Sequence, residues 1–444
     1  MLSIYRNMFR IPDLRKKILF TLAIFAVYRI GTTIPVPGVD LEAVRFFQET
    51  QQAGGIYGLL NLFSGGALEQ FSVFSLGIVP YITASIIMQL LTVVIPRLQA
   101  LQEEGESGRR IITQWTRYLT VVLALIQSTG FTYMFHSGVF TGGIDLVPNY
   151  TPSRVILIVL TMTAGTAVVM WLGELITQRG IGNGMSLLIF ISIISQFPFM
   201  FGQLWQQTGA VWRLTNDIQY LIPFIVITLV FLAMIVAIIF IDQGQRRIPV
   251  QFAKRVRGRR VLGGQSTYIP LKVNTSGVIP VIFATSVLLI PALIVTAIPV
   301  EAAWLRGIYN WINTNLGTGR TGVSWWYILI LFLLIVFFTY FYTAIQFNPE
   351  QQAEIIQRQG GFIPGVRPGR QTERHLAHIL NRITLPGSIF LATIAVLPSI
   401  ASAIWNIQIA FSGVSLLIVV GVALETMKQI ESQLTMRNYE GILT

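Results

Sequence analysis

The segment DQGQRRIPVQFAKRVRGRRVLGGQSTYIPLKVN, residues 242–274, contains eight Lys and Arg residues and a single acidic residue, and it lies between two long apolar runs. Basic residues that flank membrane spans stay on the cytoplasmic side of the membrane. The segment therefore fixes the orientation of the spans that precede and follow it. Its charge also makes it a candidate docking surface.

The composition of the whole chain indicates a polytopic membrane protein. Charged residues make up 11% of the sequence, against roughly 25% in soluble domains, hydrophobic residues make up 53%, and the mean hydropathy is +0.65. The net charge is +12. Since the apolar runs carry few charges, the excess belongs in the loops, where acidic or polyanionic partners are expected. The chain has no cysteine, which excludes disulfides, thiolate metal sites and cysteine nucleophiles.

Runs of about 18 to 25 apolar residues are long enough to cross a bilayer. The sequence contains ten, at residues 17–36, 72–95, 115–136, 154–173, 184–204, 218–241, 275–298, 324–346, 384–405 and 409–427. The basic N-terminal stretch before the first run has apolar residues on one helix face, so we expect it to lie on the membrane surface. The first run lacks a small-residue cleavage pattern and is interpreted as a retained span.

The loop charges support one orientation, with both termini in the cytoplasm. The segments placed inside hold most of the Lys and Arg residues, including the eight of residues 242–274 and five in residues 347–383. The segments placed outside hold Arg45, Arg154, Arg213, Arg306 and Arg320. Arg29, within the first span, is interpreted as a structural arginine that snorkels to the outer surface.

Residues 54–71, GGIYGLLNLFSGGALEQF, are apolar but too short and too rich in glycine to cross a bilayer. Irregular backbone is tolerated at membrane depth where it is buried in protein or lines an aqueous cavity. The segment is therefore either a re-entrant element beside a cavity or a loop on the outer surface. The residues alone leave both interpretations open.

Several kinds of chemistry lack the residues they need. The spans carry no acidic residue deep in the membrane, since Glu174, Asp242 and Glu425 lie at predicted cytoplasmic ends, which argues against a proton or sodium relay. His375 and His378 share a helical spacing but lack a clear third ligand for a metal. The glycine cluster RGIGNGMS, residues 179–186, lacks the Lys-Ser/Thr ending of a phosphate-binding loop. A small-solute transporter and an intramembrane enzyme remain rival classes. The sequence lacks the buried acidic or polar cluster expected of the first and the group of catalytic residues expected of the second.

Two pairs of apolar residues lie on single helix faces near the start of a span. Ile78 and Ile82 are four residues apart, as are Met185 and Ile189. Such spacing is equally typical of residues that face lipid or a packed core. Periodicity alone therefore does not identify the lining of a path.

Long stretches of the chain resemble signature sequences of the SecY family of bacterial protein-conducting channels, and the resemblance covers nearly the whole sequence. These stretches are FSGGALEQFSVFSLGIVPYITASIIMQLL (63–91), EGESGRRIITQWTRYLT (104–120), LGELITQRGIGNGMSLLIF (172–190), GQRRIPVQFAKRVRGRR (244–260) with STYIPLKVN (266–274), FNPEQQAE (347–354), GFIPGVRPGRQT (361–372) and MRNYEG (436–441).

The resemblance implies an all-α polytopic membrane protein whose ten transmembrane helices form two inverted five-helix halves, residues 1–204 and 205–444, around a central pore. It implies an apolar pore ring at Ile78, Ile82, Met185, Ile189, Ile282 and Ile418. Met185 replaces the more usual isoleucine and adds flexibility to the ring. The re-entrant segment matches the plug helix of the family, at Leu60, Asn61, Phe63, Ser64, Gly65, Gly66 and Leu68.

The resemblance also implies a lateral gate and a docking surface. The gate positions are Thr83, Ile86 and Gln89 of the second span and Ile282, Ser286 and Ile290 of the seventh. Polar side chains there are expected to hold a closed gate by hydrogen bonding. The docking positions for the SecA ATPase or a ribosome are Arg246, Arg247, Lys254, Arg255, Arg257, Arg259, Arg260, Arg367 and Arg370. A purely topogenic role is the alternative for these basic residues.

The implied function is the translocation of unfolded preproteins across the cell membrane, with hydrophobic segments released sideways into the bilayer. The implied partners are the small membrane subunits SecE and SecG, SecA, the ribosome, preproteins with their signal sequences, YidC, SecDF and membrane lipids. No cofactor, metal or enzymatic activity is expected.

Overall fold

The computed structural model describes residues 11–50, 61, 63–137, 145–148, 150–215, 221–252, 255–257, 260–262, 266–297, 307, 311, 324–405 and 412–443. The helices are α2 (Pro12–Gly31), α3 (Leu41–Thr50), α5 (Val79–Val94), α6 (Pro96–Glu103), α7 (Glu106–His136), α8 (Pro152–Arg179), α9 (Gly184–Ile194), α10 (Phe197–Thr215), α11 (Leu221–Gln243), α12 (Ile279–Ala297), α14 (Trp325–Gln346), α15 (Pro349–Arg358), α16 (Arg370–Trp405) and α17 (Gly413–Leu443). The strands are β1 (Gln245–Phe252), β2 (Arg255–Arg257), β3 (Arg260–Leu262), β4 (Ser266–Lys272) and β5 (Gly361–Phe362). Of the N-terminal stretch predicted to lie on the membrane surface, residues 1–10 fall outside the described residues, and the remainder begins α2.

The helices confirm a multi-pass membrane protein. Among the described residues, seven helices are long and apolar enough to cross a membrane, or eight if α5 and α6 form one bent span. The two remaining predicted spans coincide with α2 and α12. Helix α2 carries charges near both ends, at Asp13, Arg15, Lys16, Lys17 and Arg29, which lowers its apolar content. Length and composition in the structure therefore support seven or eight of the ten predicted spans.

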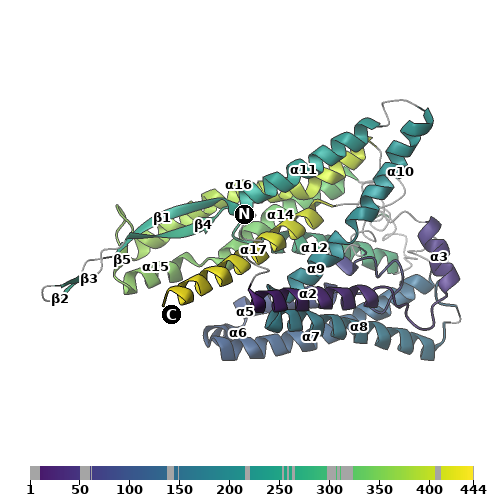
Figure 1. Cartoon of the computed structure of the whole chain (residues 1–444), viewed down its shortest axis with the longest axis horizontal. Helices are drawn as coiled ribbons and strands as arrows, with labels where there is room; N and C mark the ends of the chain where they lie inside the picture. The colour runs from purple at the N-terminus through teal and green to yellow at the C-terminus, as the bar shows by residue number, and fades with distance from the viewer. Residues whose placement is uncertain are drawn as a thin grey trace.

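The bundle is elongated, and the helices before and after α10 lie on opposite sides of it (Figure 1). Helices α7 and α8 run along one edge and α11 and α16 along the other, with α9, α14 and α17 between them. In the first set, α5 packs on α7, α7 on α8, and α8 on both α2 and α9. In the second set, α14 packs on α12 and α16, and α17 on α11 and α16. Contacts of α9 with α17 and of α7 with α12 join the two sets.

The described part of the glycine-rich segment lies inside the bundle. Ser64, Ala67 and Leu68 are almost completely buried, and the backbone N–H of Val36 donates to the carbonyl oxygen of Phe71 at 2.9 Å. Side chains of the segment belong to the same two hydrophobic clusters as the surrounding helices. The burial excludes an outer-surface loop and supports the re-entrant interpretation.

A sharp bend separates α5 from α6. The two helices meet at 100°, and Ile95 between them has an extended backbone conformation, with φ −99° and ψ 111°. Pro96 follows directly, and a proline disfavours the helical conformation of the residue before it. Helix α6 buries no residue. The second predicted span, 72–95, thus ends where the chain turns along the end of the bundle.

The basic segment 242–274 forms β-structure, which the all-α prediction did not include. Strand β1 pairs antiparallel with β4, with Ile248 opposite Ile269, and with β5 at its end, so that the sheet order is β4-β1-β5. Ile248 and Val250 of β1 are buried while their neighbours are exposed, which is the alternation of a half-buried strand. With Leu271 they pack against side chains of α15 and α16 in a separate small core.

Candidate functional site

Met185 is positioned at the start of α9 by a close contact between α8 and α9. The Oδ1 atom of Asn183 caps α9 and accepts hydrogen bonds from the backbone N–H groups of Met185, at 3.1 Å, and Ser186, at 3.5 Å. A Cβ atom on Gly184 would lie 1.8 Å from the carbonyl oxygen of Gly173, and one on Gly173 would lie 2.4 Å from the Met185 sulfur. The glycines therefore let the two helices touch and leave room for the Met185 side chain.

We expect Gly184→Ala to destabilise the protein strongly, because the new methyl group would clash with a backbone carbonyl that cannot move without separating α8 from α9. The loss in unfolding free energy should be about 1–3 kcal/mol or more, the usual cost of overpacking. Gly173→Ala should cost much less, since the clash is with the end of a flexible Met185 side chain. Thermal denaturation in detergent would measure both.

The matched control for these alanine variants is Gly130→Ala on α7, where a Cβ atom would have no neighbour within 4 Å. Alanine favours a helix more than glycine does, so this variant should be neutral or slightly stabilising. Equal melting temperatures for Gly184→Ala and Gly130→Ala would contradict the close packing of α8 on α9.

Ile78 and Ile82 lie one turn apart at the start of α5, as their spacing predicted. The backbone N–H of Ile82 donates to the carbonyl oxygen of Ile78 at 3.0 Å, and Ile78 is only 1% exposed. Gly77, directly before them, has a positive φ of 52°, and a Cβ there would lie 3.0 Å from Cα of Ser64. The glycine thus brings the start of α5 against the re-entrant segment.

The other two predicted ring residues come from the second set of helices. Ile282 lies on α12 and Ile418 on α17, and both are buried. Helix α17 begins at Gly413, where a Cβ would lie 1.9 Å from the carbonyl oxygen of Ile394 on α16. This close approach fixes how near the start of α17 lies to the backbone of α16.

All six predicted ring residues belong to the large central hydrophobic cluster of the bundle, which also takes side chains from α2, α8, α10, α11, α14 and α16. Five of them are buried, and Ile82 is half-buried and packs against the cluster. They come from four helices that are distant in sequence, namely α5, α9, α12 and α17. An apolar constriction of this composition can exclude ions by remaining dry and can yield to a passing chain without sequence-specific hydrogen bonds.

The described residues of the predicted plug form a compact turn held by its own polar groups. The carbonyl oxygen of Asn61 accepts from the backbone N–H of Gly66 at 2.9 Å, and its side-chain Nδ2 donates to Glu69 Oε2 at 2.8 Å. Ser64 Oγ accepts from the backbone N–H of Leu68 at 3.1 Å. Burial raises the pKa of Glu69 above its usual value, and the hydrogen bond from Asn61 opposes that shift. Leu60 lies outside the described residues.

Residues that the sequence analysis did not assign to the site contact this turn from α2 and α9. Arg29 is half-buried, and its guanidinium donates to the carbonyl oxygen of Gly65 at 2.8 Å and to Ser195 Oγ at 3.0 Å. Arg29 is therefore structural, as interpreted from the sequence, and its charge is directed at protein acceptors, which that interpretation did not include. The available signal was a single arginine within an apolar run, but the sequence does not show which acceptors it meets.

The predicted gate residues lie on α5 and α12, and the hydroxyl groups among them bond within their own helices. Thr83 Oγ1 donates to the carbonyl oxygen of Val79 at 3.0 Å, and Ser286 Oγ to that of Ile282 at 2.8 Å. These bonds do not link α5 to α12. Ile86 is buried and Gln89 half-buried. The backbone of Ile290 continues α12, and its side chain lies outside the described residues.

The basic residues that are described lie on one packed projection at the end of the bundle. Arg246 and Arg247 of β1 are exposed, and the Arg247 guanidinium carbon lies 4.7 Å from the centre of the Tyr268 ring. Arg367 and Arg370 are exposed on the turn between β5 and α16. Arg255, Arg257 and Arg260 lie on strands β2 and β3, which pair with each other, but their side chains lie outside the described residues, as do Lys254 and Arg259 altogether.

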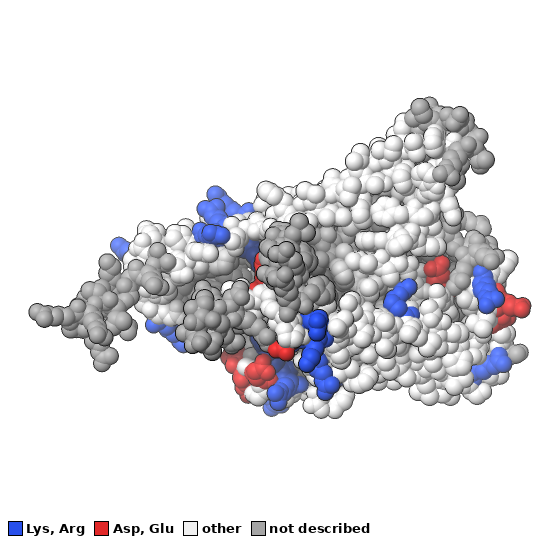
Figure 2. Space-filling view, viewed as in Figure 1, with Lys and Arg blue, Asp and Glu red and all other residues white. Residues whose placement is uncertain are grey.

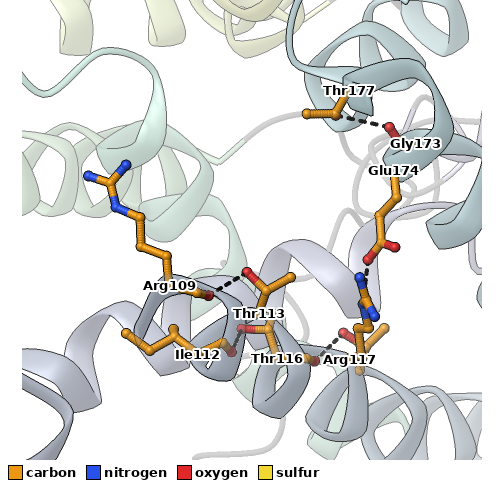
Figure 3. Close-up of polar contacts among 9 residues, drawn as sticks. Arg109, Ile112, Thr113, Thr116, Arg117, Gly173, Glu174 and Thr177 are labelled. Carbon is orange, nitrogen blue, oxygen red and sulfur yellow. Dashed lines mark hydrogen bonds and ion pairs between the residues drawn. The ribbon is translucent and has the colours of Figure 1, made fainter. Parts of the chain in front are cut away.

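On the displayed face, most charged side chains lie over the part that carries the strands and over the lower middle of the view, others lie at the opposite end, and the surface between them is largely uncharged (Figure 2). Arg117 of α7 and Glu174 of α8 form an ion pair with a separation of 2.6 Å between Nε and Oε1 (Figure 3). Glu174 thus joins two neighbouring helices, and its location at the membrane interface stays a prediction.

Comparisons with known proteins agree on one family. The family model described as SecY matches residues 72–427. The protein translocase subunit SecY of Streptomyces scabiei is 52% identical over 453 residues, with complete coverage of both chains.

Two solved structures share the fold at lower sequence identity. A SecY structure described as showing that the plug domain stabilises the closed state and maintains a membrane seal has a TM-score of 0.63 at 20% identity, covering 94% of this chain and 92% of that chain. Sec61 in the canine ribosome–channel complex has a TM-score of 0.61 at 17% identity, with the same coverage. The full-length match to curated SecY subunits and the family model, which spans most of the sequence, show that the chain belongs to the SecY family, the protein-conducting channel subunits of the Sec translocon.

Proposed function

We propose that the chain conducts unfolded preproteins across the cell membrane through a pore closed by the six-residue apolar ring. The single observation that carries this proposal is that the six residues come from four helices and share one large apolar cluster, in which Gly77 brings the first of them, Ile78, against the buried glycine-rich turn. A polar or charged constriction would bind ions or particular side chains. A dry apolar one seals without selecting a sequence, which suits a channel for many different chains.

The turn at residues 61–68 serves as the plug in this proposal. The turn is buried and is held by its own hydrogen bonds, so it can block the pore as a folded unit. It can also move out of the pore without unfolding a spanning helix. The related SecY structure described above assigns sealing to its plug domain. The same role in this chain would keep the resting channel closed to ions.

A lateral gate between α5 and α12 would release hydrophobic segments into the bilayer. The hydroxyl groups of Thr83 and Ser286 donate to backbone carbonyl oxygens of their own helices, so opening the gate would break neither of these hydrogen bonds. A Leu-like residue gains about 0.3 to 0.6 kcal/mol on entering the membrane. A sufficiently apolar segment would then partition sideways, while other segments would pass through the ring.

The basic projection would bind the motor that drives transport, either SecA or a ribosome. Arginines bind phosphate and carboxylate groups by charge-assisted hydrogen bonds, and a channel of similar fold is known from a ribosome complex.

SecE and SecG would be the small membrane subunits, with YidC, SecDF and membrane lipids as further partners. Both termini would lie in the cytoplasm. Residue 204 falls within α10, so we place the junction of the two proposed halves after that helix.

Reconstitution tests the proposed function directly. The chain is purified with SecE and SecG, incorporated into vesicles and supplied with SecA, ATP and a radiolabelled precursor protein. ATP-dependent protection of the precursor from added protease is the expected result. Uptake of a small solute without any precursor uptake would instead support the rival transporter class.

Shortening the plug by deleting residues 60–68 should leave a folded protein whose resting membranes conduct ions more readily. The segment adds neither a spanning helix nor a positive charge, so the bundle and its orientation should survive its loss. Single-channel recordings at rest provide the measurement, with melting temperature as the check on folding. A folded variant with silent currents would show that the ring alone seals the pore, and a variant that does not accumulate would assign the segment to core packing.

A further inference from the structure

Two consecutive residues of α2 each connect the plug to α9. The Tyr28 hydroxyl donates to the carbonyl oxygen of Ser64, at 3.3 Å, and lies 2.7 Å from Ser192 Oγ. The Arg29 guanidinium donates to the carbonyl oxygen of the next plug residue, Gly65, at 2.8 Å, and to Ser195 Oγ at 3.0 Å. Each residue therefore contacts one carbonyl of the proposed plug and one serine at the end of α9, Ser192 in its last turn or Ser195 at its C-cap.

The two serines are held in place to receive these contacts. Ser195 Oγ donates to the carbonyl oxygen of Ser192 at 2.8 Å and keeps its lone pairs for the Arg29 guanidinium. Ser192 Oγ lies 2.8 Å from the carbonyl oxygen of Leu188, and it donates its one hydrogen to the Tyr28 hydroxyl when that hydroxyl donates to Ser64. Tyr28 is fully buried, and its ring is stacked on that of Phe74 with centroids 5.8 Å apart. The partners are thus preorganised on both sides.

The plug is shaped to fit the end of α9. Gly65 and Gly66 have positive φ values of 69° and 87°. A Cβ on Gly65 would lie 3.2 Å from Cα of Ser192, and one on Gly66 would lie 2.2 Å from the side-chain nitrogen of Gln196. Only a segment without side chains at these two positions can lie this close to α9 while its carbonyl groups reach α2.

We propose that Tyr28 and Arg29 form a two-point latch that holds the plug closed against α9, and that they are positioning residues for the resting channel. The inference rests on the proposed function of residues 61–68 as the plug. If the plug leaves, the Tyr28 hydroxyl and the Arg29 guanidinium each lose a carbonyl acceptor, and a partly buried guanidinium without its acceptors is costly. Helix α9 also carries Met185 and Ile189, so the latch ties the plug to a helix of the ring.

A single introduced thiol can report whether the latch holds. The chain has no cysteine, and Ala67 in the plug is completely buried, so Ala67→Cys supplies a unique reporter for a water-soluble maleimide. Against the same reporter in the otherwise unchanged channel, with SecE and SecG bound, Tyr28→Phe should raise the labelling rate roughly fivefold through the loss of one neutral hydrogen-bonding group. Arg29→Gln should raise it about tenfold or more, because its bonds are charge-assisted.

A matched control and a conservative variant separate the latch from general loosening. Arg154→Gln removes an arginine that donates to the Pro148 carbonyl, away from the plug contacts, and should leave labelling unchanged. Arg29→Lys keeps the charge but replaces the planar guanidinium, whose Nη1 donates to both acceptors, by an ammonium on a shorter side chain, so its labelling rate should fall between those of the parent and Arg29→Gln. Resting ion leak measured on versions without the cysteine should rise in the same order.

A double-mutant cycle tests the specific contact. Tyr28→Phe and Ser192→Ala remove opposite ends of one hydrogen bond, so the double variant should label no faster than the faster of the two single variants. The latch would be overturned if the effects of Tyr28→Phe and Ser192→Ala on the labelling rate multiplied fully in the double variant. It would also be overturned if labelling and leak were unchanged in Tyr28→Phe and Arg29→Gln. If those variants are unchanged while the parent still imports precursor, the latch fails and the proposed function stands; a parent that imports no precursor contradicts the proposed function itself.

Discussion

Replacing Arg367 by glutamate is expected to reduce SecA-driven precursor import by about tenfold or more, the scale of a lost charge-assisted contact turned repulsive. The amount of channel in the membrane should stay near normal. Arg367 is exposed on a turn between Gly365 and Gly369, whose φ values are 82° and 97°. The backbone carbonyl of Arg367 accepts a hydrogen bond from the buried Thr372 hydroxyl at 3.0 Å. The backbone therefore sets the turn, and the side chain is left exposed for a partner.

The import assay uses channel levels matched by immunoblot, with SecA and ATP supplied. Arg382→Glu is the matched control, since it makes the same charge change at an exposed position of α16 in the same basic region. Normal import by Arg367→Glu would assign this arginine to topology or solubility. Equal losses in both variants would indicate a general electrostatic effect in place of a specific docking contact.

The membrane helices could be predicted because the bilayer imposes a length and a polarity on every span. The bend at Pro96 and the sheet of the basic segment were missed for different reasons. The span prediction ended at residue 95, beside the proline that breaks the helix, but nothing in an apolar run shows the direction that the chain takes next. The sequence shows Ile248 and Val250 two residues apart, a spacing typical of one face of a strand. The strand was not predicted because the segment was interpreted only from its many basic residues, as a docking surface and a topology signal.

For the candidate site, local geometry could be predicted and tertiary partners could not. The four-residue spacings of Ile78 with Ile82 and of Met185 with Ile189 placed each pair on one helix face, and the structure brings both pairs into the central cluster. The acceptors of Arg29 come from segments 36 and 166 residues away, which no periodicity reveals. The hydroxyl groups of Thr83 and Ser286 were expected to help close the gate, but such groups readily bond to the carbonyl one turn earlier in their own helix.

Asparagine at Ile82 or Ile418 is expected to raise resting ion conductance and to increase export of a reporter with a defective signal sequence, each by about tenfold. Both residues belong to the central cluster, and the proposed ring closes by staying dry. An amide hydrates the constriction and lowers the barrier to opening. A change of about 1.4 kcal/mol in that barrier corresponds to the tenfold effect.

Two control substitutions separate wetting of the ring from loss of stability. Leu229→Asn places the amide on the exposed face of α11, and Ile158→Asn buries it in α8, in a hydrophobic cluster separate from that of the proposed ring. An amide without a partner in an apolar environment costs about 1 to 3 kcal/mol, so both controls should lower the melting temperature without raising conductance. Ile418→Asn should share that stability loss and add the leak, because Ile418 is buried and also belongs to the ring. If Ile82→Asn and Ile418→Asn export no more reporter and conduct no more ions than the parent, these residues do not line the pore, since an amide at a dry constriction cannot leave its hydration unchanged.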